Sequence, residues 1–259
     1  MKNITVIVPV HNLDGDNKEM LYNAINTIED FHNDVKVSVV CPDSISNDLG
    51  TMSNKLEINV YGHKGETDFC SQVNYGIEKC DTKWFTILEM DDEFKSVWLK
   101  SMDEYTKIYP DVEVFLPIVK DINVEGKFIN FTNESTWAYG FTERQGFLDN
   151  EVLLDFQNHQ TSGGLYNTQT IKDNGMFKSN IKLTFSYEFL LRLTHNGVRI
   201  LTVPKVGYQH VNLREGSLFW NLKNNDSEKL SDKEVKFWLE TAKKEFFFKN
   251  KRDVEYTEA

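Results

Sequence analysis

Apolar strand segments alternate with helical segments at the start of this chain, and this alternation restricts the fold more than any other feature. The run Ile4–Val10 is mostly β-branched and ends at His11-Asn12, a pattern typical of a strand buried on both faces of a parallel sheet. Apolar side chains at helical spacing cover residues 17–31, and a second strand is expected at residues 35–40. Such a strand–helix–strand unit is the building block of a doubly wound sheet.

The alternation continues to residue 95. A third strand is expected at Leu56–Tyr61, a helix at about residues 67–79, and a fourth strand at Trp84–Leu88. In such sheets ligands bind outside the carboxyl ends of the strands, so polar side chains at those ends are the first candidates for a functional site. The sequence therefore predicts an α/β protein whose mainly parallel, Rossmann-like sheet is flanked by helices.

The second half is less regular and predicts a small antiparallel addition to the sheet. Trp137, Tyr139 and Phe141 alternate as in a half-buried strand, although an exposed aromatic ring there could stack on a sugar. The remaining expected elements are strands at residues 112–119, 126–131 and 199–203, the last ending at Pro204, and helices at residues 147–156 and 185–195.

No linker rich in proline, glycine or serine divides the chain into two cores. We therefore expect one compact domain over residues 1–222 and a C-terminal helical extension over residues 223–259. The helix of this extension is expected to begin at the capping box Ser231-Asp232-Lys233-Glu234.

The charge balance argues against an obligate nucleic-acid partner. Forty acidic side chains against 29 basic ones give a formal net charge of −11, which repels phosphate backbones and anionic membranes. The three cysteines form no CxxC pair, so they are expected to be free thiols in a reducing compartment. No run approaches the ~20 apolar residues of a membrane span, and no signal-peptide pattern is present, so we expect a cytoplasmic protein.

One segment departs from this acidic character. Residues 232–252 combine Trp238 and Phe246-Phe247-Phe248 with several lysines, including Lys251, and Arg252. A basic aromatic helix can bind a membrane surface, here the inner face, or a protein partner. It can equally pack on its own domain, with the positive charges favourably placed at the end of the helix.

Four carboxylates follow the fourth predicted strand within five positions, in the run Glu89-Met90-Asp91-Asp92-Glu93. Such a cluster repels itself unless a cation is bound, and carboxylate oxygens suit Mg²⁺ or Mn²⁺. A solvated acidic turn is the alternative.

Four motifs in order decide between these readings. They are Pro9-Val10-His11-Asn12 after the first strand, Asp43-Ser44-Ile45-Ser46-Asn47-Asp48 after the second, Gly65 followed by Asn74-Tyr75-Gly76-Ile77, and Glu89-Met90-Asp91-Asp92 after the fourth. In this order and at this spacing, they resemble the motifs of family 2 glycosyltransferases with the GT-A fold. More loosely, Gly175-Met176-Phe177, the helix from Tyr187 to Leu193, His210 and Arg214–Leu218 resemble later parts of that family.

The resemblance implies a nucleotide-sugar donor, with UDP as the expected nucleotide, and Mn²⁺ or Mg²⁺ to neutralise its diphosphate. It implies Asp91 as the metal ligand, Glu89 as a contact to ribose or metal, and Asp92 as a catalytic residue that faces the sugar or the metal. His210 could complete the coordination. The remaining residues implied for donor binding are Pro9, Val10, Asn12, Asp43, Ser46, Asn74 and Arg214.

Two positions depart from the family pattern. Glu89 replaces the first Asp of the Asp-x-Asp motif, which lengthens that side chain by one methylene. More seriously, Ser186 stands where inverting members carry the Asp that deprotonates the acceptor, and a serine hydroxyl cannot act as a base at neutral pH. Glu188 is the first substitute, with Asp173 and His159 as further candidates. Glu188 is equally well explained as an acidic residue at the start of a helix.

The leading hypothesis is therefore a metal-dependent glycosyltransferase that moves a sugar to a hydroxyl acceptor with inversion. The acceptor can be a glycan, a lipid-linked glycan or another hydroxyl compound, because residues 120–165 match no pattern that identifies it. Ser186 motivates the alternative, a catalytically silent GT-A-like module that binds a nucleotide sugar or glycan. A nucleotidyltransferase is disfavoured, since no glycine-rich phosphate loop follows the first strand.

Overall fold

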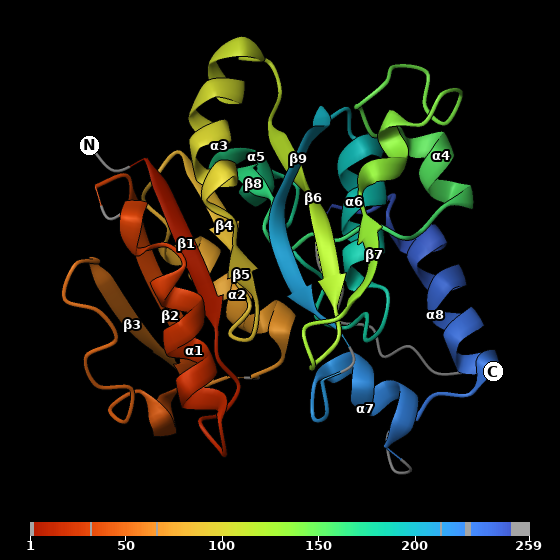
Figure 1. The fold of residues 1–259 in the computed structure, drawn as a ribbon. Helices are drawn as coiled ribbons and strands as arrows, with labels where there is room; N and C mark the ends of the chain where they lie inside the picture. Colours follow the sequence, from red (N-terminus) through yellow and green to blue (C-terminus); the bar gives the residue numbers. More distant parts are fainter. Residues whose placement is uncertain (1–2, 32, 66, 213, 226–228, 250–259) are drawn as a thin grey trace.

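A single nine-stranded sheet organises the computed structural model, which describes residues 3–31, 33–65, 67–212, 214–225 and 229–249. The strands run in the order β3-β2-β1-β4-β8-β6-β9-β5, and β7 pairs with β6 (Figure 1). The architecture is the expected one, a Rossmann-like sheet flanked by helices.

The first half confirms the strand–helix alternation. β1 lies between β2 and β4 and is parallel to both, with Ile4 opposite Val35 on one side and Trp84 on the other. The elements are β1 (Ile4–Pro9), α1 (Asn17–Asn26), η1 (Glu29–Phe31), β2 (Val35–Pro42), η2 (Asp43–Ile45), β3 (Ile58–His63), α2 (Phe69–Lys79) and β4 (Trp84–Ile87).

The second half adds the predicted antiparallel part. β8 is antiparallel to both β4 and β6, so β6 and its parallel neighbour β9 run in the same direction as β1 and β4. The elements are β5 (Glu93–Phe94), α3 (Ser96–Ile108), β6 (Val114–Ile122), β7 (Phe128–Thr132), η3 (Glu134–Trp137), α4 (Asn150–Asp155), β8 (Leu165–Asn167), α5 (Thr168–Asp173), α6 (Phe185–His195), β9 (Ile200–Val211), α7 (Leu218–Asn224) and α8 (Asp232–Glu245).

Two local predictions are wrong. The strand expected to end at Pro204 continues to Val211, because the register against β6 shifts between Pro117 and Ile118 and so accommodates the proline without a ladder hydrogen bond. The aromatic residues at 137–141 form no strand. Trp137 ends η3 and donates from Nε1 to the carbonyl of Thr202 at 3.0 Å, whereas Tyr139 is 98% exposed.

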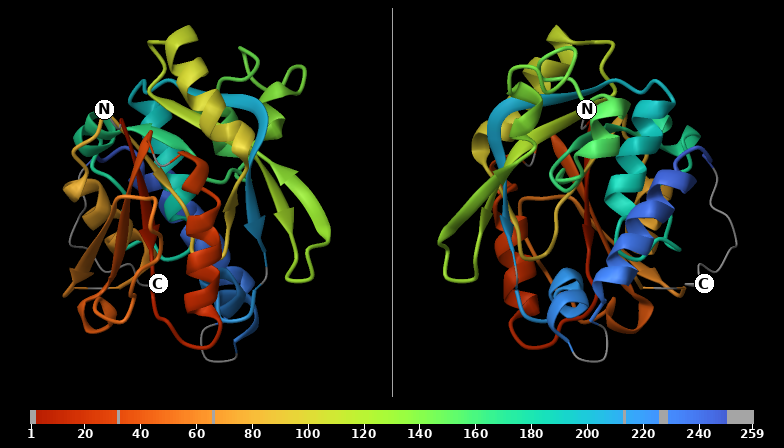
Figure 2. Two further views of the ribbon diagram at one scale, coloured as in Figure 1. Left: turned by 60° about the vertical axis from the view of Figure 1, so that its left-hand side comes forward. Right: turned by 90° about the vertical axis from the view of Figure 1, so that its right-hand side faces the viewer.

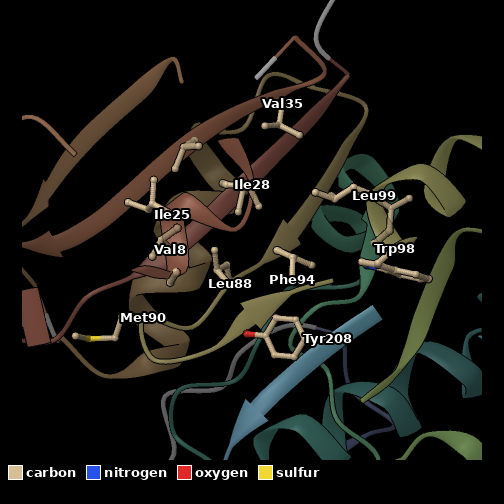
Figure 3. Packing of buried hydrophobic residues seen from close by; sticks show 14 of the residues in the cluster. Val8, Ile25, Ile28, Val35, Leu88, Met90, Phe94, Trp98, Leu99 and Tyr208 are labelled. Carbon is tan, nitrogen blue, oxygen red and sulfur yellow. The ribbon is translucent and has the colours of Figure 1, made fainter. Parts of the chain in front are cut away.

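Two hydrophobic clusters form the core. One joins α1 and α3 to the sheet and includes Ile25, Trp98 and Tyr208 (Figure 3). The other contains buried residues of α2, α6 and α8. Gly207 lies directly beneath Trp98, where an added Cβ would come within 2.6 Å of the indole ring.

Helix α8 packs against α6 (Figure 2). The capping box at Ser231 and Glu234 is present, and Trp238, Ala242 and Phe246 are buried in the second cluster. Helix α8 of the expected extension thus shares the core of the main domain, although Lys251 and Arg252 lie outside the described residues. Within the described ranges, no helix combines the length and apolar character needed to span a bilayer.

Candidate active site

A cavity of about 790 Å³ opens at one edge of the sheet. Because β1, β4, β6 and β9 run in the same direction, their carboxyl ends meet at this edge (Figure 1). Each contributes a polar or turn residue to the lining: Pro9, Glu89, Asp121 and His210. The cavity thus lies where ligands bind in doubly wound sheets, at the carboxyl ends of the strands.

Glu89, Asp92 and His210 form a cluster beside this cavity. Each offers a ligand atom, and these atoms lie within 4.8 Å of one another. Nδ1 of His210 is 3.0 Å from Oδ2 of Asp92, and the backbone N–H of Val211 donates to Oδ1 of Asp92 at 2.9 Å. Ser162 donates its hydroxyl hydrogen to Oε1 of Glu89 at 2.6 Å. Two carboxylates and an imidazole are thus held in fixed positions.

The charges in this cluster are poorly balanced. Burial, together with the nearby charge of Asp92, raises the pKa of Glu89 to about 7. Burial alone would lower the pKa of His210, but the Asp92 carboxylate against its ring outweighs this effect and raises that pKa to about 10. In the absence of a cation the cluster therefore retains protons. A divalent cation would relieve the same repulsion, and the ligand types suit Mg²⁺ or Mn²⁺.

Asp91 points elsewhere. Its Oδ2 is 2.5 Å from Nε of Arg214, and both residues line the cavity. The three-residue cluster therefore includes Asp92 rather than the neighbouring Asp91, which was expected to be the main metal ligand. Burial and the charge of Asp92 also raise the pKa of Asp91, so this carboxyl group, like that of Glu89, holds its proton more tightly than a free one.

The residues predicted for donor binding separate into two groups. Pro9, Asn12 and Arg214 line the cavity. Asp43 and Ser46 lie at η2, next to the end of β2, and are not among the lining residues of the described chain. Asp43 faces Lys64 at 3.8 Å, and Ser46 donates to the backbone carbonyl of Asp43 at 2.9 Å. Their role in donor binding stays a prediction.

Two residues predicted to bind the donor, Val10 and Asn74, are not among the cavity-lining residues of the described chain. The side chain of Val10 is fully buried in the core, so it cannot contact a ligand in the cavity. The amide of Asn74 is used by the backbone of Phe177: it donates to the carbonyl at 2.7 Å and accepts from the N–H at 2.9 Å. Asn74 thus joins α2 to the segment before α6, a structural role that a sequence motif cannot reveal.

Glu188, the predicted catalytic base, lies in a buried ion pair and is not among the cavity-lining residues of the described chain. Its carboxylate is fully buried and lies 2.8 Å from both Nζ of Lys178 and Nε of Arg192. A carboxylate neutralised by two cations and absent from the cavity lining cannot receive a proton from an acceptor there. Asp173 is exposed at the end of α5 and accepts a hydrogen bond from Gln169 at 2.8 Å.

Ser186 and His159, by contrast, both line the cavity. Oγ of Ser186 is 3.0 Å from Oγ1 of Thr161. His159 is only 8% exposed, and neither ring nitrogen has a hydrogen-bond partner among the described residues. Burial lowers the pKa of His159 to about 4, so the ring is neutral at pH 7.

Asp121 is the site residue that sequence reasoning missed. It is 4% exposed, lines the cavity, and has a pKa raised by burial to about 6. It lies opposite His210 in the β6–β9 ladder. The sequence feature that could have identified Asp121 is its position near the end of a strand. This position indicates a site residue only once β6 is known to run in the same direction as β1.

Comparisons with known proteins agree with this geometry. The model of "Glycosyl transferase family 2" matches residues 5–163, more than half of the chain. No curated protein matches the sequence.

Solved structures share the fold. S. aureus TarS 1-349 in complex with UDP-GlcNAc has a TM-score of 0.66 at 19% identity over 92% of this chain. A mannosyltransferase from Pyrobaculum calidifontis, PcManGT, in complex with GDP-Man and Mn²⁺, has a TM-score of 0.61 at 13% identity over 85% of this chain. The chain spans 64% and 60% of these two structures, respectively.

Proposed function

This chain belongs to glycosyl transferase family 2, and we propose that it transfers a sugar from a UDP-linked donor to a hydroxyl acceptor, with inversion at the anomeric carbon. The observation that carries this proposal is the cluster of Glu89, Asp92 and His210 at the cavity where four parallel strands end. The complexes of TarS with UDP-GlcNAc and of PcManGT with GDP-Man support a nucleotide sugar as the donor.

The residues present fit a divalent metal. Glu89, Asp92 and His210 would hold it, with Asp91 as a further carboxylate on the same wall. When bound, a divalent ion neutralises the diphosphate of the donor and stabilises the charge of the leaving group. Arg214 supplies a cation beside Asp91 that can contact a donor phosphate, while Pro9 and Asn12 border the same cavity.

The cavity wall around Ser186 supports an acceptor that binds through its hydroxyl groups. Ser186 and Thr161 offer hydroxyls, and His159 offers a neutral imidazole. These groups hydrogen-bond to sugars and other polyols without requiring a charge on the acceptor. The acceptor is therefore assigned to the class of hydroxyl compounds, which includes glycans and lipid-linked glycans.

Thermal unfolding with a panel of sugar nucleotides tests the donor assignment, since a ligand that binds only the folded state raises the melting temperature. We expect UDP-GlcNAc or another UDP-sugar to stabilise the protein in the presence of Mn²⁺ and not with EDTA. Asp92→Asn should abolish this stabilisation. Asp81→Asn, which changes an exposed carboxylate paired with Lys36, should retain it.

Turnover of the donor separates the enzyme from a silent binding module. Release of UDP from UDP-GlcNAc with Mn²⁺ supports the transferase. Binding of UDP without turnover of any UDP- or GDP-sugar would contradict it.

We also infer that the end of α8 contacts an anionic surface, such as the inner face of a membrane. Phe247 and Phe248 are 56% and 41% exposed, and Lys244 and Lys249 are exposed beside them. Exposed aromatic and basic side chains together favour binding at a charged interface. Sedimentation with phosphatidylglycerol vesicles tests this contact, and Phe247→Ser with Phe248→Ser should abolish it.

A further inference from the structure

His159 is the most unusual polar residue of the cavity wall. Both ring nitrogens are buried and have no hydrogen-bond partner among the described residues, while its nearest described ring contact is the edge of Phe156, with centroids 5.5 Å apart. A buried polar group without a partner destabilises the fold. Because His159 lines the cavity, a ligand placed there can supply the missing hydrogen bonds.

The loop that carries His159 is held firmly at both sides of the site. Buried Asn133 donates to the carbonyl of Gln160 at 3.1 Å and accepts from its N–H at 2.9 Å. Thr161 is 3.0 Å from Ser186, and Ser162 donates to Glu89 at 2.6 Å. The loop thus contacts both the start of α6 and the carboxylate cluster, and His159 lines the cavity two residues before Thr161.

The same wall lacks the carboxylate that inverting members of the family use. Ser186 cannot accept a proton at neutral pH, and Glu188 is buried between Lys178 and Arg192. The carboxylates Glu89 and Asp91 belong to the wall that would hold the metal, and Asp121 adjoins it through His210. His159 lies on the loop between α4 and β8 and lines the cavity, apart in sequence from these carboxylates.

From this geometry we propose that His159 binds the attacking hydroxyl of the acceptor and takes its proton. This inference rests on the proposed transferase function. A neutral imidazole has one nitrogen with a free lone pair and one that carries a hydrogen, so it can accept from one hydroxyl and donate to a second. It therefore suits a neutral polyol acceptor.

Proton transfer to His159 accompanies formation of the new glycosidic bond. The acceptor O–H bond breaks, its proton moves to the free ring nitrogen, and its electron pair forms the new bond to the anomeric carbon. The bond between that carbon and the diphosphate oxygen breaks, and its electrons leave with the nucleoside diphosphate. The imidazolium then returns the proton to water.

Comparison of His159→Gln with a matched control tests this assignment. Gln keeps a polar side chain but has no basic nitrogen, and His195→Gln makes the same change at an exposed position outside the cavity. The substrates are UDP-GlcNAc and GDP-Man with Mg²⁺, with water or methyl β-glucoside as the acceptor. The measured quantities are the turnover number, its pH profile and the Kd of UDP from calorimetry.

We expect turnover by His159→Gln to fall about 100-fold, in keeping with the loss of a general base, while the Kd of UDP stays within twofold. The acidic limb of the pH profile should disappear in this variant and persist in His195→Gln. Turnover within threefold of wild type, or a parallel loss of UDP binding, would overturn the inference. So would retained turnover in His159→Gln combined with its loss in Asp121→Asn.

Failure of the transferase proposal gives a different result. A wild-type protein that binds UDP and turns over neither donor would overturn that proposal, and this inference with it. Reduced turnover confined to His159→Gln supports both.

Discussion

Nδ1 of His210 lies 3.0 Å from Oδ2 of Asp92, although 118 positions separate them in the chain. Asp92 follows β4 and His210 lies near the end of β9, and these strands are not adjacent in the sheet. The contact forms because both strands run in the same direction and the short strand β5 pairs with β9 just after the acidic motif. The principal candidate site thus depends on the pairing of β5 with β9.

His210→Ala should weaken Mn²⁺ binding about 10- to 100-fold, since it removes one ligand of the cluster and the partner of Asp92. Electron paramagnetic resonance of free Mn²⁺ measures this directly. His63→Ala, at the end of β3 and away from the cavity lining, serves as the control. Equal Mn²⁺ affinity in His210→Ala and wild type would remove His210 from the proposed site.

The pH dependence of stability should reveal the unbalanced charges. The pKa of His210 is raised from 6.5 to about 10, and that of Glu89 from 4.5 to about 7. A raised pKa means that the folded state holds the proton more tightly, so the stabilisation is complete below the unfolded value and is lost as pH rises through the folded value. The Glu89 contribution should therefore disappear between about pH 4.5 and 7, and the His210 contribution between about pH 6.5 and 10.

Melting temperatures in EDTA measure this effect. They should fall from pH 6 to pH 9, and His210→Gln should reduce the fall. Added Mg²⁺ should reduce it as well, because the cation replaces the protons that the cluster loses. A melting temperature that rises over this range in EDTA would contradict the assigned pKa directions.

Glu188→Gln should destabilise the fold rather than act on the chemistry. The change removes the carboxylate that Lys178 and Arg192 share in a fully buried setting, although Lys178 keeps Glu245 at 3.6 Å, and breaking a buried pair costs about 3–5 kcal/mol. Urea unfolding measures the loss, and the exposed pair Asp103–Lys107 provides a control, since Asp103→Asn should leave stability unchanged. The folded fraction of Glu188→Gln should still bind UDP. Full stability with lost turnover would return Glu188 to the list of candidate bases.

Gly207→Ala should destabilise the sheet where α3 crosses it. The added Cβ would lie 2.6 Å from Cγ of Trp98, whose Nε1 donates to the carbonyl of Gly163 at 2.8 Å. Overpacking of this kind costs about 1–3 kcal/mol. Lys205→Ala, at an exposed position of the same strand, should leave the midpoint of urea unfolding unchanged. A Gly207→Ala midpoint equal to wild type would show that Trp98 can move aside.

The local pattern of the sequence predicts much of this protein. Hydrophobic periodicity identifies β1, β2, β4 and α6. The spacing of apolar side chains along one strand or helix follows from the geometry of that element alone. The acidic run after β4 indicates a cation site because four carboxylates cannot lie together without compensation. The four ordered motifs point to the family because their residue types, order and spacing can be read along the chain without knowledge of the fold.

Tertiary structure alone decides which of these side chains face the cavity. Neighbours in sequence point in different directions, so Asp92 meets His210 while Asp91 meets Arg214. Glu188 is directed into a buried ion pair, although Ser186, two residues earlier in the first turn of α6, lines the cavity. Asp121 and His159 join the site only because β6 and the loop before β8 are brought to the ends of β4 and β9. Such contacts depend on long-range packing, which local periodicity does not encode.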